Sequence, residues 1–116
     1  MSSCKTLLDA LRAGSHDQAL AALYALDGGQ DSLGRARDRA CHVVQSFLGA
    51  FSPAEDAPAA LFSGPGRTEI GGNHTDHQHG RVLCGSVDLD MLACAAPNGL
   101  GVVRFVSQGY PALRSI

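Results

Sequence analysis

The spacing of apolar positions along the chain changes near Ser52 and Pro53. Before that point, apolar residues recur every three or four positions, which is the period of amphipathic helices. After it, they come in short runs or alternate with polar residues, as strands do. The sequence therefore predicts an α+β fold class, with a helical N-terminal leader over residues 1–52 followed by strands.

Two short helices are expected first. The first has one apolar stripe, which Gly14 ends. The second begins at a capping box made by Ser15 and Gln18 and ends at the glycines 28 and 29. The stripe of the first helix comprises Cys4, Leu7, Leu8 and Leu11, and the second helix carries Leu20, Leu23 and Tyr24.

A third, longer helix has the cleanest amphipathic pattern, and Asp31 or Ser32 is expected to cap its N-terminus. Its charged face is interpreted as solvated, and no function is assigned to it. The apolar stripe comprises Leu33, Ala36, Ala40, Val43, Val44, Phe47, Leu48 and Phe51.

Strands are expected after Pro53. Residues 59–62 form a short apolar run, and residues 87–95 alternate between apolar and polar side chains. The turn signal at 97–99, with its Asn-Gly pair, predicts a hairpin whose return strand covers 101–107. Because the last forty residues offer strands but no helix to cover their second face, we expect a truncated part of a larger sheet domain.

Composition narrows the class of protein. The 116 residues suit one small domain, and a net charge of −2 argues against a nucleic-acid-binding face. The N-terminus lacks a signal-peptide pattern and no apolar run is long enough to span a membrane, so a cytoplasmic protein is expected. The cysteines show no CxxC spacing and are expected to be reduced and mostly buried: Cys4, Cys41, Cys84 and Cys94.

Residues 64–80, GPGRTEIGGNHTDHQHG, contain three of the five histidines of the chain. A metal site built from Asp76 and the three histidines would need the segment to fold back tightly, and no HExxH pattern is present. The glycines free backbone N–H groups for an anion, but neither common phosphate-loop motif occurs. A polar pocket and a solvated glycine-rich loop remain open. The histidines are His74, His77 and His79.

The polar-pocket interpretation rests on four side chains within ten residues. Arg67, Asn73, His74 and Asp76 offer a cation, an amide, an imidazole and a carboxylate. A carboxylate accepts hydrogen bonds from neighbouring sugar hydroxyls, and an arginine stabilises negative charge that develops where oxygen meets phosphorus. This combination is what carbohydrate recognition with phosphoryl transfer requires.

The stretch PGRTEIGGNHTDHQHGRVLCGSVDLD resembles the first signature of galactokinases, which are GHMP small-molecule kinases. The resemblance is best over about residues 58–110, and it implies that residues 53–116 are the N-terminal part of a galactokinase-like GHMP kinase domain. The sequence departs from the family pattern at three positions. Asn73 replaces the usual glutamate, His77 the usual tyrosine, and Glu69 the usual asparagine.

The resemblance also implies roles for the four polar residues. Arg67 would be catalytic, beside the anomeric oxygen of the sugar, and would stabilise charge on the transferring phosphoryl group. Asp76 would hold adjacent ring hydroxyls. Asn73 and His74 would contact the hydroxymethyl end of the sugar.

The reaction that the resemblance implies is phosphorylation of galactose at its anomeric hydroxyl with ATP and Mg²⁺, the entry step of galactose metabolism. The nucleotide-binding loop and catalytic aspartate of the family are absent from these 116 residues, so the isolated chain is expected to be inactive. Three alternatives remain open: a kinase for an N-acetylhexosamine or arabinose, a non-catalytic sugar-sensing protein, and a small metal-binding module.

Overall fold

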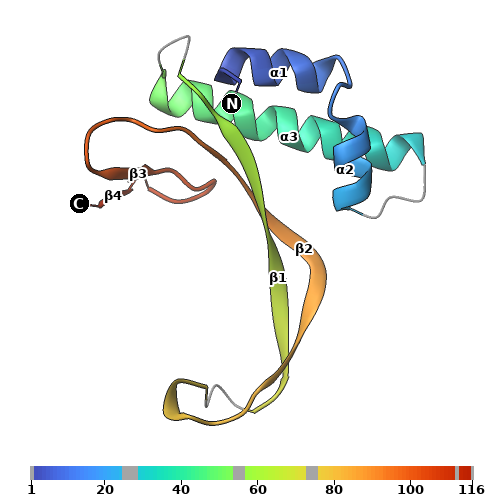
Figure 1. Cartoon of the computed structure of the whole chain (residues 1–116), viewed down its shortest axis with the longest axis vertical. Helices are drawn as coiled ribbons and strands as arrows, with labels where there is room; N and C mark the ends of the chain where they lie inside the picture. The colour runs from blue at the N-terminus through green and yellow to red at the C-terminus, as the bar shows by residue number, and fades with distance from the viewer. Residues whose placement is uncertain (1, 25–28, 54–56, 73–75, 112, 116) are drawn as a thin grey trace. The chain divides into compact units, whose positions relative to one another are not determined.

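The computed structural model describes residues 2–24, 29–53, 57–72, 76–111 and 113–115. The chain divides into two compact units (Figure 1). The first, called the helical unit here, comprises residues 1–61 and 94–116. The second, called the ribbon, comprises residues 62–93.

Three helices build the helical unit: α1 (Cys4–Arg12), α2 (Asp17–Leu23) and α3 (Gln30–Phe51). Both short helices pack against α3 (Figure 1). Ala36, Ala40 and Val44 recur every fourth position and are the buried residues of α3, so one face of α3 supports the other two helices. The remaining buried apolar residues are Cys4, Leu7, Leu8, Leu11, Leu20 and Ala59. The predicted helices and the stripe of α1 are confirmed.

The start of α2 differs from the prediction. The backbone N–H of Ser15 donates to the carbonyl of Ala10, and that of Asp17 donates to Gly14. Residues 14–16 are thereby held in a turn, and His16 takes the N-cap position without a side-chain hydrogen bond. The predicted capping box of Ser15 and Gln18 is therefore wrong.

The start of α3 also differs. Gly29, and not Asp31 or Ser32, is the N-cap residue. Its carbonyl accepts from the backbone N–H of Ser32 at 3.1 Å and of Leu33 at 3.2 Å. A helix that begins this early already includes both predicted caps in its first turn, where their side chains no longer precede the helix.

An ion pair joins α2 to α3. Arg37 Nε donates to Asp17 Oδ1 at 2.9 Å, and Arg37 Nη2 donates to the second carboxylate oxygen. Hydrogen bonding to Asp17 and its negative charge raise the pKa of Arg37. A residue of the face interpreted as solvated therefore fixes the position of a neighbouring helix.

The last strands of the helical unit correct the predicted hairpin. A turn does form, because Asn98 Oδ1 accepts from Leu100 N and Asn98 Nδ2 donates to the Val102 carbonyl, both at 2.9 Å. Gly99 and Gly101 have φ of 64° and 65°. The two central residues of an Asn-Gly hairpin loop are adjacent and both left-handed, whereas Leu100 separates the left-handed residues here. The following strand, β3 (Val103–Phe105), pairs antiparallel with β4 (Leu113–Ser115) instead.

The ribbon is formed by β1 (Ala60–Gly71) and β2 (Leu83–Ala95), which pair antiparallel. The first two residues of β1 and the last two of β2 belong to the helical unit. The predicted strand at 87–95 is confirmed and begins four residues earlier. Strand β1 continues through residues 63–71, which the sequence interpretation treated as a loop. Gly66 explains the difference, because a Cβ there would lie 2.9 Å from Val87 Cγ2 and 3.0 Å from the Leu89 carbonyl oxygen. The glycine serves close approach between strands and not a turn.

All four cysteines are free thiols, as predicted, but only Cys4 is buried. Cys84 is exposed because it lies on the ribbon, where no second layer of described residues covers it. The expectation of mostly buried thiols is therefore wrong. Within the described ranges, no helix is long and apolar enough to cross a membrane.

Candidate functional site

All four predicted sugar-contacting residues fall within the ribbon segment. Arg67 lies on β1 and its side chain is exposed. Asp76 begins the 3₁₀ helix η1 (Asp76–Gln78). Asn73, His74 and the side chain of Asp76 lie outside the described part of the chain. The structure thus places Arg67 on a regular strand that ends just before the other three positions.

Strand alternation gives the ribbon one polar face. Ser63 Oγ donates to Asp90 Oδ2 at 2.5 Å, so odd-numbered residues of β1 share a face with even-numbered residues of β2. Arg67 therefore lies on the same face as Asp88 and Asp90. A cation beside carboxylates forms a surface rich in hydrogen-bonding groups, which suits a ligand with many hydroxyls.

The two aspartates were not recognised as possible members of the site. Their alternation with apolar residues in β2 was visible in the sequence, but it was used only to predict the strand. The missing step was the pairing of β2 with β1, which brings Asp90 to Ser63 and so to the face of Arg67.

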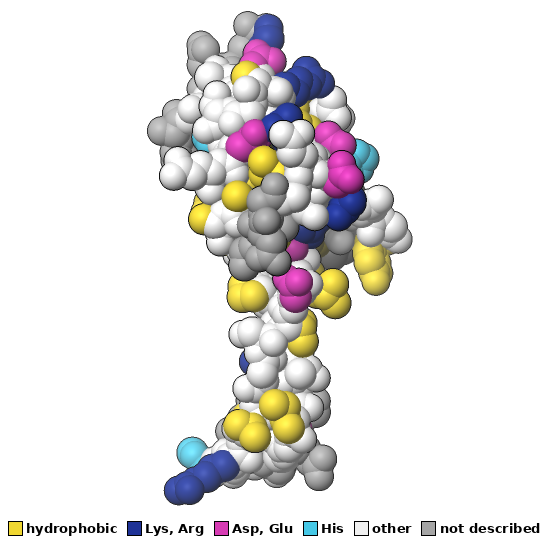
Figure 2. Space-filling view, turned by 90° about the vertical axis from the view of Figure 1, so that its right-hand side faces the viewer, with side chains coloured by type: hydrophobic (Ala, Val, Ile, Leu, Met, Phe, Trp, Pro, Cys, Tyr) yellow, Lys and Arg dark blue, Asp and Glu magenta, His cyan; other side chains and the backbone are white. Residues whose placement is uncertain are grey.

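The opposite face of the ribbon is apolar. A Cβ added at Gly66 would lie 2.9 Å from Val87 Cγ2, and one added at Gly85 would lie 3.5 Å from Ile70 Cδ1. These residues therefore lie on one face. Figure 2 shows hydrophobic side chains at the surface along this part of the chain. The large apolar residues of this face are between 57% and 76% exposed: Phe62, Ile70, Leu83, Leu89 and Met91.

Gly72 fixes the end of β1 next to the predicted sugar contacts. Its φ is 119°, a conformation that residues with side chains rarely adopt. A Cβ at this position would lie 2.6 Å from the Arg81 carbonyl oxygen and 2.7 Å from Val82 Cα. Only glycine therefore allows the two ends of the segment 73–80 to approach this closely.

The described residues contain no group of three or more His, Cys, Asp or Glu side chains placed to hold a metal ion. His77 and His79 are exposed, and His79 adopts a positive φ of 62°. Two members of the hypothetical metal site, His74 and the carboxylate of Asp76, fall outside the described positions.

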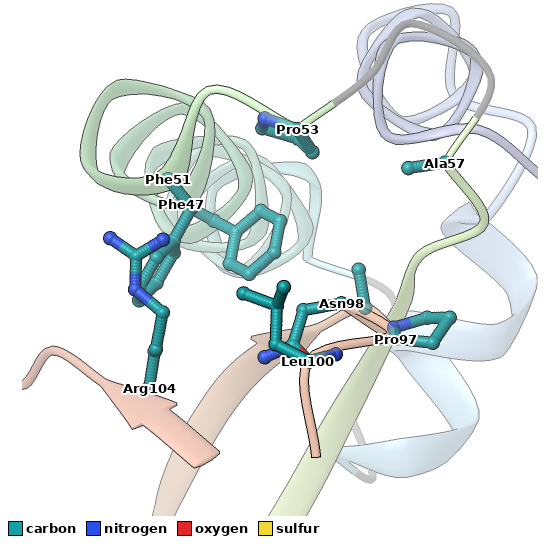
Figure 3. A pocket seen from close by; sticks show the side chains of 9 residues that line it. Phe47, Phe51, Pro53, Ala57, Pro97, Asn98, Leu100 and Arg104 are labelled. Atoms are coloured by element: carbon teal, nitrogen blue, oxygen red, sulfur yellow. The ribbon is translucent and has the colours of Figure 1, made fainter. Parts of the chain in front are cut away.

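The helical unit contains a cavity that sequence reasoning missed (Figure 3). Phe47 and Phe51 were assigned to the apolar stripe of the third helix, and their spacing of four positions gave no sign of a ligand. Nothing in the sequence connected them with Leu100 and Arg104, which join them in lining the cavity.

Residues 45–97 match a known protein-family model. They match the galactokinase galactose-binding signature, and this range spans the positions of Arg67, Asn73, His74 and Asp76. The chain therefore carries a galactokinase N-terminal signature, and the resemblance is confirmed. Three helices followed by an antiparallel two-stranded sheet form an α+β arrangement consistent with part of an N-terminal galactokinase domain. No solved structure matches the chain.

Proposed function

We propose that this chain is the sugar-binding part of a galactokinase-like kinase. The observation that supports the proposal is the match to the galactose-binding signature over residues 45–97, the range in which the four predicted sugar contacts lie. The complete enzyme would transfer the γ-phosphoryl group of ATP to the anomeric hydroxyl of galactose. A cytoplasmic location is part of the same proposal, because ATP is supplied there.

Each residue has a chemical role in this proposal. The guanidinium of Arg67 is permanently charged and exposed on the polar face of the ribbon, where it would neutralise charge between the anomeric oxygen and phosphorus. The carboxylate of Asp76 would accept hydrogen bonds from two adjacent ring hydroxyls. The amide of Asn73 and the imidazole of His74 would contact the hydroxymethyl group.

ATP and Mg²⁺ would be held by residues other than these. The 116 residues include neither a GxxxxGK[ST] loop nor a GxGxxG loop. In-line phosphoryl transfer requires both substrates to be positioned and the phosphate charge to be neutralised. We therefore expect the isolated chain to bind sugar without phosphorylating it, and a sensitive assay for sugar phosphate would detect a violation.

Sugar binding is tested by isothermal titration of the chain with D-galactose, with its C4 epimer D-glucose as the control ligand. Asp76→Asn should weaken galactose binding by roughly tenfold or more, because a hydrogen bond to a charged acceptor contributes about 1.5–3 kcal/mol. Asp38→Asn, at an exposed position of α3, is the matched control and should bind as the unchanged chain does. Equal binding by both variants would contradict the role of Asp76.

Sugar identity is tested with the same titration. N-acetylgalactosamine, N-acetylglucosamine and L-arabinose represent the alternative substrates, and preference for one of them would redirect the proposal within the kinase class. Asn73→Glu restores the residue usual in the family and should strengthen galactose binding if galactose is the substrate. Binding of sugar without turnover by the complete product of the reading frame would favour a sugar-sensing protein.

A further inference from the structure

The cavity in the helical unit has the size of a small-ligand site. Its volume is about 310 Å³, at the lower end of the range of roughly 300–1,000 Å³ for ligand pockets. Its described walls come from the last turns of α3, from Pro53 and Ala57 before β1, from the segment between β2 and β3, and from β3 itself. The lining includes two aromatic rings, an aliphatic side chain and a cation: Phe47, Phe51, Leu100 and Arg104.

Two aromatic rings form one wall. The ring centroids of Phe47 and Phe51 are 5.1 Å apart with an interplanar angle of 49°. In Figure 3, the Leu100 side chain extends from the turn toward Phe47, and the Arg104 side chain lies beside Phe51. The cavity therefore has an apolar region and a cationic side.

The guanidinium of Arg104 retains its hydrogen-bonding edge. Its Cζ lies over the ring of Phe51, 5.4 Å from the centroid, within the range of a cation–π contact. The N–H groups point outward in the guanidinium plane and are not used by this contact. No hydrogen bond or ion pair joins the Arg104 side chain to another described residue, and none of the described residues that line the cavity is acidic.

Asn98, the other polar side chain of the lining, is already engaged. Its oxygen accepts from Leu100 N and its nitrogen donates to the Val102 carbonyl. These two bonds fix the side chain in the turn and leave one N–H donor and one oxygen lone pair of the amide unused. Arg104 is the cationic side chain among the described residues of the lining, so recognition of a negatively charged group in this cavity depends on Arg104.

We propose that this cavity binds a small amphipathic carboxylate, with its flat apolar body against Phe47 and Leu100 and its carboxylate on Arg104. A planar carboxylate matches the paired N–H groups of a guanidinium and forms two parallel hydrogen bonds. A neutral apolar molecule of the same shape fits less well, because it would remove Arg104 from water without replacing its hydrogen bonds.

The test uses phenylacetate as the probe in a titration followed by amide NMR shifts. Saturable binding is expected, with shifts in residues 47–51 and 97–104. The neutral analogue 2-phenylethanol and the ring-free anion acetate should each bind at least tenfold more weakly, because each lacks one of the two recognised features. Equal binding of phenylacetate and 2-phenylethanol would overturn the proposal.

Variants of the chain test separately the charge of Arg104 and the shape of the cavity. Arg104→Gln should weaken phenylacetate binding about tenfold or more, and Arg104→Lys should give an intermediate loss because it keeps the charge without the paired donors. Arg12→Gln removes the same charge from an exposed position on α1 and should leave binding unchanged. Ala57→Leu adds volume to the cavity wall and should weaken binding without a change in charge.

Circular dichroism of each variant checks that the helices remain. A folded chain that does not bind phenylacetate, or a folded Arg104→Gln variant that binds normally, would overturn the proposal. Sedimentation that shows a dimer dissociated by phenylacetate would replace it with a second copy as the occupant. None of these outcomes depends on galactose, because all the cavity residues lie outside the ribbon.

Discussion

The helical unit buries many of its apolar side chains, whereas the ribbon leaves its large apolar side chains exposed to solvent. In the helical unit, Ala40 and Val44 have no exposed surface, and α1 and α2 cover the face of α3 on which they lie. In the ribbon, no described residue is buried, and Leu89 and Met91 are 76% and 73% exposed. The helical unit has its own core, whereas a two-stranded ribbon alone is at best marginally stable in water.

This difference bears on the proposed sugar site. Arg67 is presented by the less stable of the two units, on a strand whose other face is apolar and exposed. Precise positioning of a catalytic side chain requires rigid support. We therefore expect an additional apolar layer to be needed before Arg67 is held as catalysis demands.

Substitution of one leucine in each unit gives the largest expected difference in stability between the helical unit and the ribbon. Leu11→Ala in the helical core should lower the free energy of unfolding by about 2–5 kcal/mol, because Leu11 is 2% exposed and its removal leaves a cavity. Leu89→Ala in the ribbon should change it by less than about 0.5 kcal/mol. Urea unfolding followed by circular dichroism at the helical band measures both. Similar losses for the two variants would show that the ribbon shares in a core.

Two adjacent glycines at the end of β1 differ in how much their substitution should destabilise the ribbon. Gly72→Ala should destabilise the ribbon by about 1–3 kcal/mol, because the added Cβ meets backbone atoms of Arg81 and Val82 at a positive φ. Gly71→Ala is the control, since no heavy atom lies within 4 Å of its added Cβ. Amide hydrogen exchange of residues 62–71 and 83–93 reports the effect. Comparable exchange in both variants would contradict this account of Gly72.

Thiol chemistry distinguishes the two units with a smaller effect. Burial raises the pKa of Cys94 from 9.0 to about 12, with further contributions from Cys4, to which it is hydrogen bonded. Exposed Cys84 on the ribbon should react first with iodoacetamide at mildly alkaline pH, and Cys4 and Cys94 last. Peptide mass spectrometry of the alkylated chain gives the order, and faster labelling of Cys94 than of Cys84 would refute it.

The same pKa predicts a pH dependence of stability. Below pH 9 the thiol of Cys94 keeps its proton in the folded and unfolded chain, so it contributes no pH dependence. Between pH 9 and about 12 the unfolded chain releases the proton first, so stability should fall as pH rises. Cys94→Ser should reduce this slope in urea unfolding measured across that range. A slope that is the same in Cys94→Ser as in the unchanged chain would contradict this account.

Local patterns predicted the helices and β2 well. The apolar stripe of α1 and the alternation of residues 87–95 are patterns among residues that are close in sequence. The period of such a pattern is enough to identify the helix or the strand. The interpretation of residues 63–71 was wrong, because a glycine such as Gly66 signals a turn and a close strand contact equally well. The short strand β4 had too few residues for any period.

The site was predictable to a similar extent. The order of polar residues predicted sugar contacts at Arg67 and its neighbours, and this assignment stays a prediction. The shared face of Arg67, Asp88 and Asp90 depends on how two strands pair, and the cavity at Arg104 depends on a long-range contact with Phe51. Neither contact leaves a local pattern.

The contacts of residues 2–4 have a consequence for how the chain folds as it is made. The Ser2 carbonyl accepts a hydrogen bond from the Ala59 backbone N–H, Ser3 forms a β-bridge with Pro58, and the thiol of Cys4 is hydrogen bonded to that of Cys94. A ribosome releases a chain in order of sequence, so these contacts form only after α3, on which α1 packs, has been made. The start of α1 thus completes its contacts only when synthesis has passed residue 94, well after the helices it packs on.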